Sequence, residues 1–377
     1  MTAPRPAAPD VRRPGDAPAP EQGPLPGGWR PDGLVDGRLS PVAADAVRTY
    51  ATTELATVGR SGVPVAWPVV TLLDEAAGTL TLTTSVAFPV KALNVRRDPR
   101  VSLLFSEPTG TGGPALPHVL VRGRATCPDV LRVDPAGLEP YWERIYRLQP
   151  SGASYLQGPL LPRVMDWYWF RLVLTVVPDE VLLRPADAVP DLSPDPAPGV
   201  TAPARGGDPL ARFRRVAADL PSAVLSWVGD DAVPRQARVR LAGTAPGTAP
   251  GTAPGTAPRT AAGTAGEGGD VLRVLAAPGE PLVAGPASVL VHTHDDRLDA
   301  QRTAGAAGRL VPDADGWAFT PERSLGGFGG ESPVAAARTL LGARRAAGRY
   351  LDRRGWARPA VPVAAYRTLA RAAGASR

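Results

Sequence analysis

Lys91 is the only lysine in a chain of 377 residues, in which lysine and arginine together number 42. A single lysine among so many arginines indicates a position that needs a compact ammonium on a flexible stem instead of a planar fork. Three hydroxyl side chains, Thr83, Thr84 and Ser85, precede it at the end of an apolar run. Pro89 suits the first turn of a helix, so Lys91 would lie beside unpaired backbone N–H groups. Hydroxyls, free amides and one ammonium together can form a phosphate cradle.

The elements that would position this cradle are strands. Apolar, β-branched runs at 55–58, 63–73 and 79–84 are separated by Gly-containing turns, and a short helical segment then leads into a fourth run at 101–105. This pattern predicts strand, turn, strand, turn, strand, short helix and strand. The simpler alternative is that Lys91 is an ordinary solvated lysine on a connector, and spacing alone leaves both interpretations open.

An ordered series of segments in this half of the chain resembles a known superfamily. LATVGRSGVPVAWPVV, TLTLTTS, KALNVRRDPRVSLL and HVLVRGRATC are similar to the FMN-binding split barrels, which include pyridoxamine 5′-phosphate oxidase and deazaflavin-dependent reductases. The resemblance covers about residues 41–185. It implies that Pro68, Val69 and Val70 face the ring of the cofactor. It also implies that Thr84, Ser85 and Lys91, with Thr83 in the same hydroxyl trio, bind the cofactor phosphate.

The resemblance also carries functional expectations. It implies an oxidoreductase that binds FMN or a deazaflavin and acts on an unidentified small molecule. No counterpart of the oxidase's C-terminal arginine–histidine segment is evident, which puts the vitamin B6 reaction in doubt, and no catalytic residue can be named. The alternative is a non-catalytic protein of the same fold that binds or senses a flavin or haem. Split barrels usually dimerise around the flavin, so we expect a homodimer or an internal pseudo-dimer.

Composition limits the partners and the location. The chain has 45 Pro and 41 Gly, which indicates disordered segments between folded ones. Its net charge of +6 is spread through arginines, so nucleic acid is not expected as a partner. No run approaches the roughly 20 apolar residues of a membrane span, so we expect no membrane partner and a cytoplasmic location. The single cysteine excludes an internal disulfide.

The second half of the chain repeats the first in degenerate form. PSAVLSWVGDDAVPRQARVRL has the layout of ELATVGRSGVPVAWPVVTL, but the lysine and the hydroxyl trio are missing, so no second phosphate site is expected.

The predicted fold is mainly β with flanking helices: a split β-barrel, two in tandem, plus C-terminal helices, with an unrelated α+β second domain as the alternative. The predicted division is a disordered lead at 1–39, a flavin-binding barrel at 40–185, a linker at 186–208, a degenerate barrel at 209–330 with a GTAP-repeat loop at 243–269, and a helical segment at 331–377.

Metal chemistry and the common catalytic motifs find little support. His292 and His294 alternate on a predicted strand, and with the acids that follow they could ligate zinc or iron. A third ligand at motif spacing is missing, so no metal site is predicted. His118 could be a strand-end surface residue or a proton donor near the flavin. No G-x-S-x-G, Walker or G-x-G-x-x-G context occurs.

Overall fold

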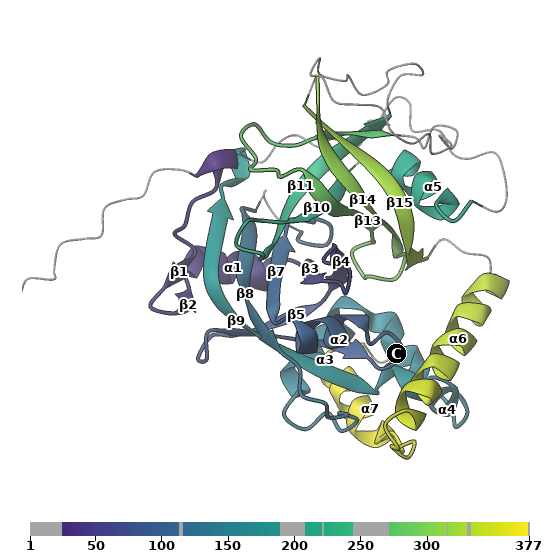
Figure 1. The fold of residues 1–377 in the computed structure, drawn as a ribbon. Helices are drawn as coiled ribbons and strands as arrows, with labels where there is room; N and C mark the ends of the chain where they lie inside the picture. The colour runs from purple at the N-terminus through teal and green to yellow at the C-terminus, as the bar shows by residue number, and fades with distance from the viewer. Residues whose placement is uncertain are drawn as a thin grey trace, which may run out of the picture.

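Two β-barrels, one above the other in Figure 1, make up most of the molecule. The computed structural model describes residues 25–112, 116–188, 208–220, 222–243, 271–314, 316–329 and 333–375. Most of the predicted lead, the linker and the GTAP repeats therefore lie outside the described residues.

The first barrel is a seven-stranded sheet in the order β4-β3-β7-β8-β9-β6-β5. Only Val70 separates β4 from β5, so the chain itself joins the two edges of the sheet. The predicted split barrel is confirmed by this topology. Its strands are β3 (Thr53–Val58), β4 (Pro64–Val69), β5 (Thr71–Asp74), β6 (Thr79–Ser85), β7 (Arg100–Phe105), β8 (His118–Thr126) and β9 (Arg171–Arg184).

Two helices flank these strands. Helix α1 (Pro41–Thr49) begins as the sequence indicates, because the Ser40 hydroxyl accepts a hydrogen bond from the Ala43 N–H (3.4 Å) and proline follows the cap. Helix α2 (Val90–Arg97) follows β6, with Pro89 as its N-cap residue. Lys91 therefore lies in the first turn of α2, as predicted.

The second barrel is closed, in the order β10-β11-β12-β15-β14-β13. The two sheets have the same strand order when β10 is matched with β3, β12 with β6, β13 with β7, β14 with β8 and β15 with β9. The single strand β11 then takes the place of both β4 and β5. A helix, α5 (Ala211–Asp219), precedes the first strand, as α1 does in the first barrel. The strands are β10 (Ser222–Val228), β11 (Pro234–Gly243), β12 (Leu272–Leu275), β13 (Gly285–Thr293), β14 (Arg302–Asp313) and β15 (Gly316–Phe328).

A β-bulge recurs at the same place in both barrels. The register shifts at Gly123, which faces Pro178 on the next strand, and again at Gly308, which faces Pro321. A Cβ on Gly123 would lie 2.2 Å from a carbonyl oxygen of the facing strand, and one on Gly308 would lie 1.9 Å from the equivalent oxygen. Both bulges therefore need glycine, because the facing backbone approaches too closely for a side chain.

The turn after the first strand also recurs. Gly62 donates a hydrogen bond to the Gly59 carbonyl oxygen (3.0 Å), and Ala232 donates to that of Gly229 (2.9 Å). Both donors have a left-handed backbone, with φ of 78° at Gly62 and 59° at Ala232. Of these two residues, only Ala232 carries a Cβ, and holding it in the left-handed conformation costs about 1 kcal/mol of folding free energy.

The barrels pack through reciprocal strand contacts. Strand β4 contacts β13, and its counterpart β11 contacts β7, the counterpart of β13. Leu104 and Leu290 hold the same register position, opposite Glu54 and Val224 on the neighbouring strands, and both lie in the apolar cluster between the barrels. Reciprocal contacts of this kind define an approximate two-fold axis between the barrels.

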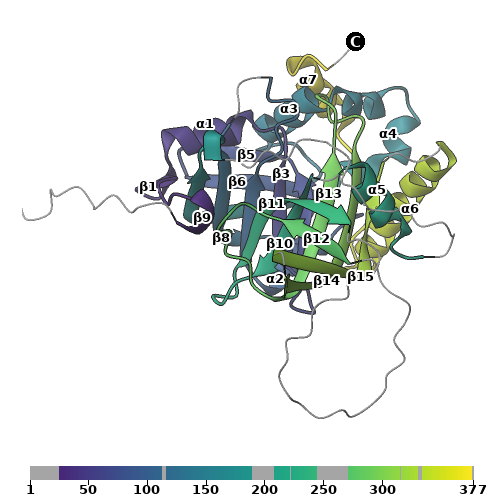
Figure 2. The same cartoon turned by 90° about the horizontal axis from the view of Figure 1, so that it is seen from above.

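The chain ends return to the first barrel. Residues 25–39, part of the predicted disordered lead, instead form η1 (Pro26–Gly28), β1 (Leu34–Val35) and β2 (Arg38–Leu39). After the second barrel, α6 (Pro333–Asp352) and α7 (Val363–Ala372) lie beside first-barrel elements, which both views show in yellow (Figures 1 and 2). The ring of Tyr366 packs 4.8 Å from that of Trp142.

The remaining helical pieces join β8 to β9 or follow β9. These pieces are α3 (Glu139–Leu148), η2 (Pro150–Leu156), α4 (Leu161–Val164), η3 (Asp166–Tyr168) and η4 (Ala186–Ala188). Among the helices described, none has the length and apolar character needed to cross a membrane.

Candidate functional site

The side chain of Lys91 turns from α2 toward β4. Its Nζ lies 5.1 Å from the ring centroid of Trp67, in the geometry of a cation–π contact. Neither a hydrogen bond nor an ion pair joins Nζ to any described residue. Burial, together with the positive charge of Arg171, lowers the pKa of Lys91 from 10.5 to about 8. Lys91 is thus half-buried, and its ammonium is charged at neutral pH with no acidic partner among the described residues.

The three residues predicted to face the cofactor ring lie at the end of β4 next to Trp67. Pro68 and Val70 are partly exposed, whereas Val69 is buried and packs in the core of the first barrel. Alternate residues of a strand point to opposite faces. The side chain of Val69 therefore points into the core, and only its backbone could lie along a bound ring.

The hydroxyl trio is buried, and each hydroxyl has a partner within the protein. Thr83 donates to the Tyr141 hydroxyl (3.2 Å) and Thr84 to the Phe88 carbonyl oxygen (2.9 Å). Ser85 donates to the Trp167 carbonyl oxygen (2.7 Å) and accepts from the Ala87 N–H (3.1 Å). The structure therefore brings the trio to the β6–α2 connector, where its hydrogen bonds fix the backbone that carries Lys91.

Those hydrogen bonds leave little donor capacity for an anion. A serine hydroxyl has one hydrogen to donate, and Ser85 uses it on a carbonyl oxygen of its own chain. The same holds for Thr84. In the described conformation, a phosphate would gain more from the unpaired ammonium than from these two hydroxyls.

Arg171 is a site residue that the sequence reasoning missed. It opens β9 and pairs in register with Ser85. Its guanidinium lies 4.6 Å from the ring centroid of Tyr168 and 5.1 Å from that of Trp142. Its Nε is buried without a hydrogen-bond partner among the described residues. The FRLVLT segment predicts a strand that begins near this arginine. Only the pairing of β9 with β6 shows that Arg171 lies next to the predicted phosphate site.

Two cations without a carboxylate make this region distinctive. Most buried or half-buried arginines of the described chain have an acidic partner, such as Arg184 with Glu280 or Arg238 with Glu54. Lys91 and Arg171 are close enough for Arg171 to lower the pKa of Lys91. Holding like charges together in a partly desolvated place is unfavourable unless an anion compensates them.

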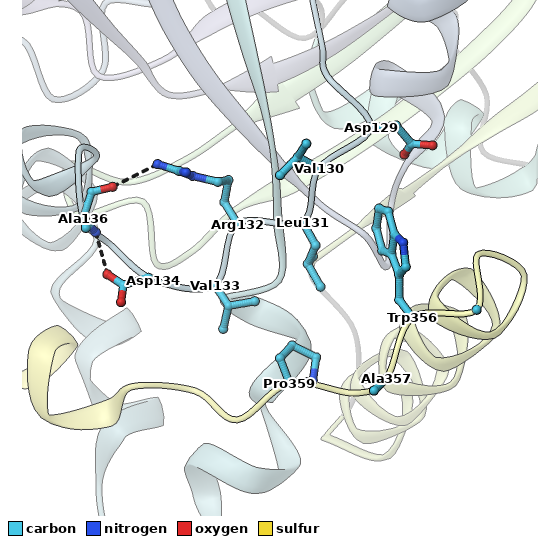
Figure 3. Close-up of a pocket in the computed structure, with 11 residues that line it drawn as sticks. Asp129, Val130, Leu131, Arg132, Val133, Asp134, Ala136, Trp356, Ala357 and Pro359 are labelled. Carbon is cyan, nitrogen blue, oxygen red and sulfur yellow. Dashed lines mark hydrogen bonds between the residues drawn. The ribbon is translucent and has the colours of Figure 1, made fainter.

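A cavity of about 760 Å³ lies elsewhere, between the loop at 129–136 and the segment at 355–359. Figure 3 shows Trp356 and Pro359 on one side and Val130, Leu131 and Val133 on the other. Its polar groups are used internally, since Arg132 donates to the Ala136 carbonyl oxygen (3.0 Å) and Asp134 accepts from the Ala136 N–H (2.8 Å). None of the predicted site residues lines this cavity.

A second buried polar network joins the two barrels. Glu54 of β3 accepts from Arg238 of β11 (2.7 Å) and lies 2.8 Å from Nε2 of His292. His294 lies 3.1 Å from the Thr52 hydroxyl. The two histidines thus contact residues of the first barrel. In the described part of the chain, no cluster of three metal-ligating side chains occurs. This network could not be predicted from the sequence, because its members come from opposite halves of the chain.

His118 belongs to the same buried region. Burial, with the positive charges of Arg238 and Arg184, lowers its pKa from 6.5 to about 3. Its Nδ1 is buried without a hydrogen-bond partner among the described residues. The imidazole is therefore neutral at physiological pH and unsuited to act as a general acid.

Comparison with known proteins gives structural neighbours only. No family model matches the sequence, and no curated protein matches it. Among solved structures, a candidate pyridoxamine 5′-phosphate oxidase from Listeria innocua is 22% identical over 37% of this chain and 92% of its own, with a TM-score of 0.26. A conserved hypothetical protein from Mycobacterium tuberculosis is 26% identical over 42% and 94%, with a TM-score of 0.28. An F420 reductase is 20% identical over 38% and 98%, with a TM-score of 0.24. Proteins of the kinds that the sequence resemblance named are thus among the similar structures.

Proposed function

We propose that this chain is an oxidoreductase of the split-barrel type that binds an anionic flavin-type cofactor, FMN or a deazaflavin, and acts on a small molecule. The observation that carries the proposal is the pair of neighbouring cations, Lys91 and Arg171, which have no acidic partner in the described structure. A phosphate would compensate both charges at once.

Each part of the region has a role in this proposal. Lys91 and Arg171 hold the phosphate, the backbone from Pro68 to Val70 runs along the ring, and the hydroxyl trio fixes the β6–α2 connector. The bound cofactor supplies the hydride chemistry, and the protein supplies orientation and exclusion of water. Thr83 is the one member of the trio whose partner is another hydroxyl, that of Tyr141, so it alone could turn its hydrogen toward an anion without abandoning a carbonyl oxygen.

The second barrel completes the enclosure as an internal partner. Its β13–β14 loop reaches the start of η2, where the N-cap residue Gln149 donates to the Leu298 carbonyl oxygen (3.2 Å) and Ser151 donates to Asp299. Tyr155 of η2 packs 5.3 Å from Tyr168, the ring against which Arg171 lies. Three contacts in series therefore connect the loop of the second barrel to Arg171: Asp299 with Ser151 of η2, Tyr155 of η2 with Tyr168, and Tyr168 with Arg171. This supports an internal pseudo-dimer over a homodimer.

The test is cofactor binding by the purified full chain. We expect FMN or a deazaflavin to bind, with Lys91→Met and Arg171→Met each weakening the affinity by tenfold or more, because each removes one charge-assisted contact to phosphate. Arg345→Met is the matched control, since Arg345 is an exposed arginine on α6. Bleaching of the bound cofactor by a nicotinamide donor would demonstrate redox competence. Equal affinities in all four proteins would refute the phosphate assignment.

The pH dependence of binding gives a second readout. Lys91 has a pKa of about 8 in the described structure, so it loses its charge as pH rises beyond that value. We expect the affinity for a phosphate-bearing cofactor to fall above about pH 8 in the wild type. In Lys91→Arg, whose guanidinium stays charged, this fall should be absent. Binding that occurs without any bleaching would favour the non-catalytic alternative.

A further inference from the structure

An approximate two-fold axis creates two equivalent places for any site that lies between the barrels. The β6–β7 connector, which carries Lys91, corresponds to the β12–β13 connector at 276–284, because the strands that flank them hold the same positions in the two sheets. If a cofactor binds at the first connector, symmetry offers a second position at the other. The side chains at the two positions differ sharply.

The position at Lys91 is accessible. Lys91 itself, Trp67, Pro68 and Val70 are all partly exposed to solvent. Two apolar side chains of the connector and α2, Phe88 and Val90, are about half exposed. A ligand can therefore reach the ammonium and the end of β4 without displacing a core residue.

The position at the second connector is filled by an ion pair. Glu280, in that connector, pairs with Arg184 from the end of β9, and the exposed fractions of the two side chains are 3% and 0%. The indole N–H of Trp29 donates to Glu280 (3.2 Å), and the guanidinium of Arg184 lies 4.2 Å from the Trp29 ring centroid. A segment from the N-terminal side of the first barrel thus occupies this end of the interface.

Glycine lets that segment approach. Gly27 has a φ of 77°, and a Cβ there would lie 3.0 Å from a guanidinium nitrogen of Arg184 and 3.0 Å from a carboxylate oxygen of Glu280. A side chain at this position would be strained by the left-handed backbone and would crowd the ion pair.

The counterpart of the ring-facing strand is blocked as well. Strands β4 and β11 begin at Pro64 and Pro234 after turns of equal length, so Arg238 holds the position of Pro68. Arg238 is buried, and its guanidinium donates to Glu54 (2.7 Å), Ser106 (2.9 Å) and Glu107 (3.2 Å). A ring lying on β11 would have to displace this network.

The same symmetry identifies a wall of the accessible position. His118 pairs with Arg184, and Thr303 pairs with Phe328. Leu104 and Leu290 are equivalent, and they pair with Leu120 and Gly305 on the next strand. His118 and Thr303, each two residues before these partners, are therefore equivalent as well. Phe328 is therefore the counterpart of Arg184, and unlike it is 42% exposed.

We infer that the chain contains two symmetry-related cofactor positions, of which only the one at Lys91 binds a cofactor. Phe328 of the second barrel lies against that cofactor. Trp29, Arg184 and Glu280 close the other position. This rests on the proposed function for the identity of the ligand. It adds that one chain binds one cofactor and that the second barrel contributes an aromatic residue to the site.

The experiment combines titration of the full chain with FMN and thermal unfolding without ligand. We expect one FMN per chain. Phe328→Ala should weaken the affinity three- to tenfold with an unchanged unfolding temperature, because Phe328 is partly exposed. Glu280→Gln should lower the unfolding temperature by several degrees, because it leaves Arg184 buried without a counter-charge, and should not change the affinity. Glu322→Gln, at an exposed acid, is the matched control and should change neither.

Three results would overturn the inference: two FMN per chain, an unchanged affinity in Phe328→Ala, or an unfolding temperature of Glu280→Gln equal to that of Glu322→Gln. If neither FMN nor a deazaflavin binds to the wild type, the proposed function fails, and the assignment of Phe328 fails with it. The closure of the Glu280 position is then decided by the unfolding temperatures alone.

Discussion

Replacing Lys91 by methionine should make the protein more stable while it weakens cofactor binding. The pKa of Lys91 is lowered from 10.5 to about 8, which corresponds to a cost of about 3 kcal/mol for keeping the ammonium charged in the folded protein. Because the side chain is only half-buried, solvent screening reduces this figure. The contact with Trp67 returns about 0.5–1 kcal/mol. Methionine keeps an apolar stem of similar length, so we expect a gain of about 1–2 kcal/mol at pH 7.

The sign of the pH dependence follows from the same shift. Between pH 8 and 10.5 the unfolded chain binds more protons at this lysine than the folded chain does, so wild-type stability rises with pH across this window. The cost is fully present below pH 8. Lys91→Met lacks the group, so its advantage over the wild type should be largest at pH 7 and should shrink by pH 10.

The assay is urea unfolding of the wild type, Lys91→Met and Lys91→Arg at pH 7 and pH 10. Lys91→Arg is the control, since its guanidinium stays charged at both values and should give no relief at pH 10. A methionine variant that is less stable than the wild type at pH 7 would refute the reasoning. It would mean that the ammonium stabilises the fold and has a structural role.

Three further predictions follow from the repeated bulge, the repeated turn and the buried histidine. Gly123→Ala should destabilise the first barrel by about 3 kcal/mol or more, since its Cβ would lie 2.2 Å from a carbonyl oxygen, and calorimetry would measure the loss. Gly62→Ala should cost about 1 kcal/mol in urea unfolding, whereas Ala232→Gly should cost nothing, because both positions have a left-handed backbone. The pKa of His118 is lowered to about 3, so its neutral form stabilises the fold above pH 6.5 and this contribution is lost as pH falls toward 3. His118→Asn, which cannot bind that proton, should lose less stability than the wild type between pH 6.5 and pH 4 in urea titrations.

Much of the first barrel could be predicted because its signals are local. The strand runs, the Ser40–Pro41 helix start and the position of Lys91 in a first helical turn depend only on neighbouring residues. Hydrophobic periodicity and capping report such features directly. The layout shared by 54–72 and 221–241 likewise pointed to a second barrel, and the strand order there agrees with it.

The rest of the candidate site depends on contacts between distant residues. Arg171 reaches the site because β9 pairs with β6 some 90 residues away, and Glu54 meets Arg238 only because the barrels pack. The ordered segment at 25–39 was missed for a similar reason. Its composition is typical of disorder, but Trp29 is held by Glu280 and Arg184 from far along the chain.

The fusion of two barrels gives a physical reason why one position can be lost without the other. In a homodimer every substitution occurs twice, so closing one site closes both. In a single chain the counterpart of a cationic connector can become Glu280, and the counterpart of Pro68 can become Arg238, while Lys91 and Pro68 remain as they are. The buried ion pairs formed in this way also fix the relative position of the barrels, because breaking either leaves a buried charge without a partner. In the proposed arrangement, these ion pairs also hold the second barrel beside the accessible position.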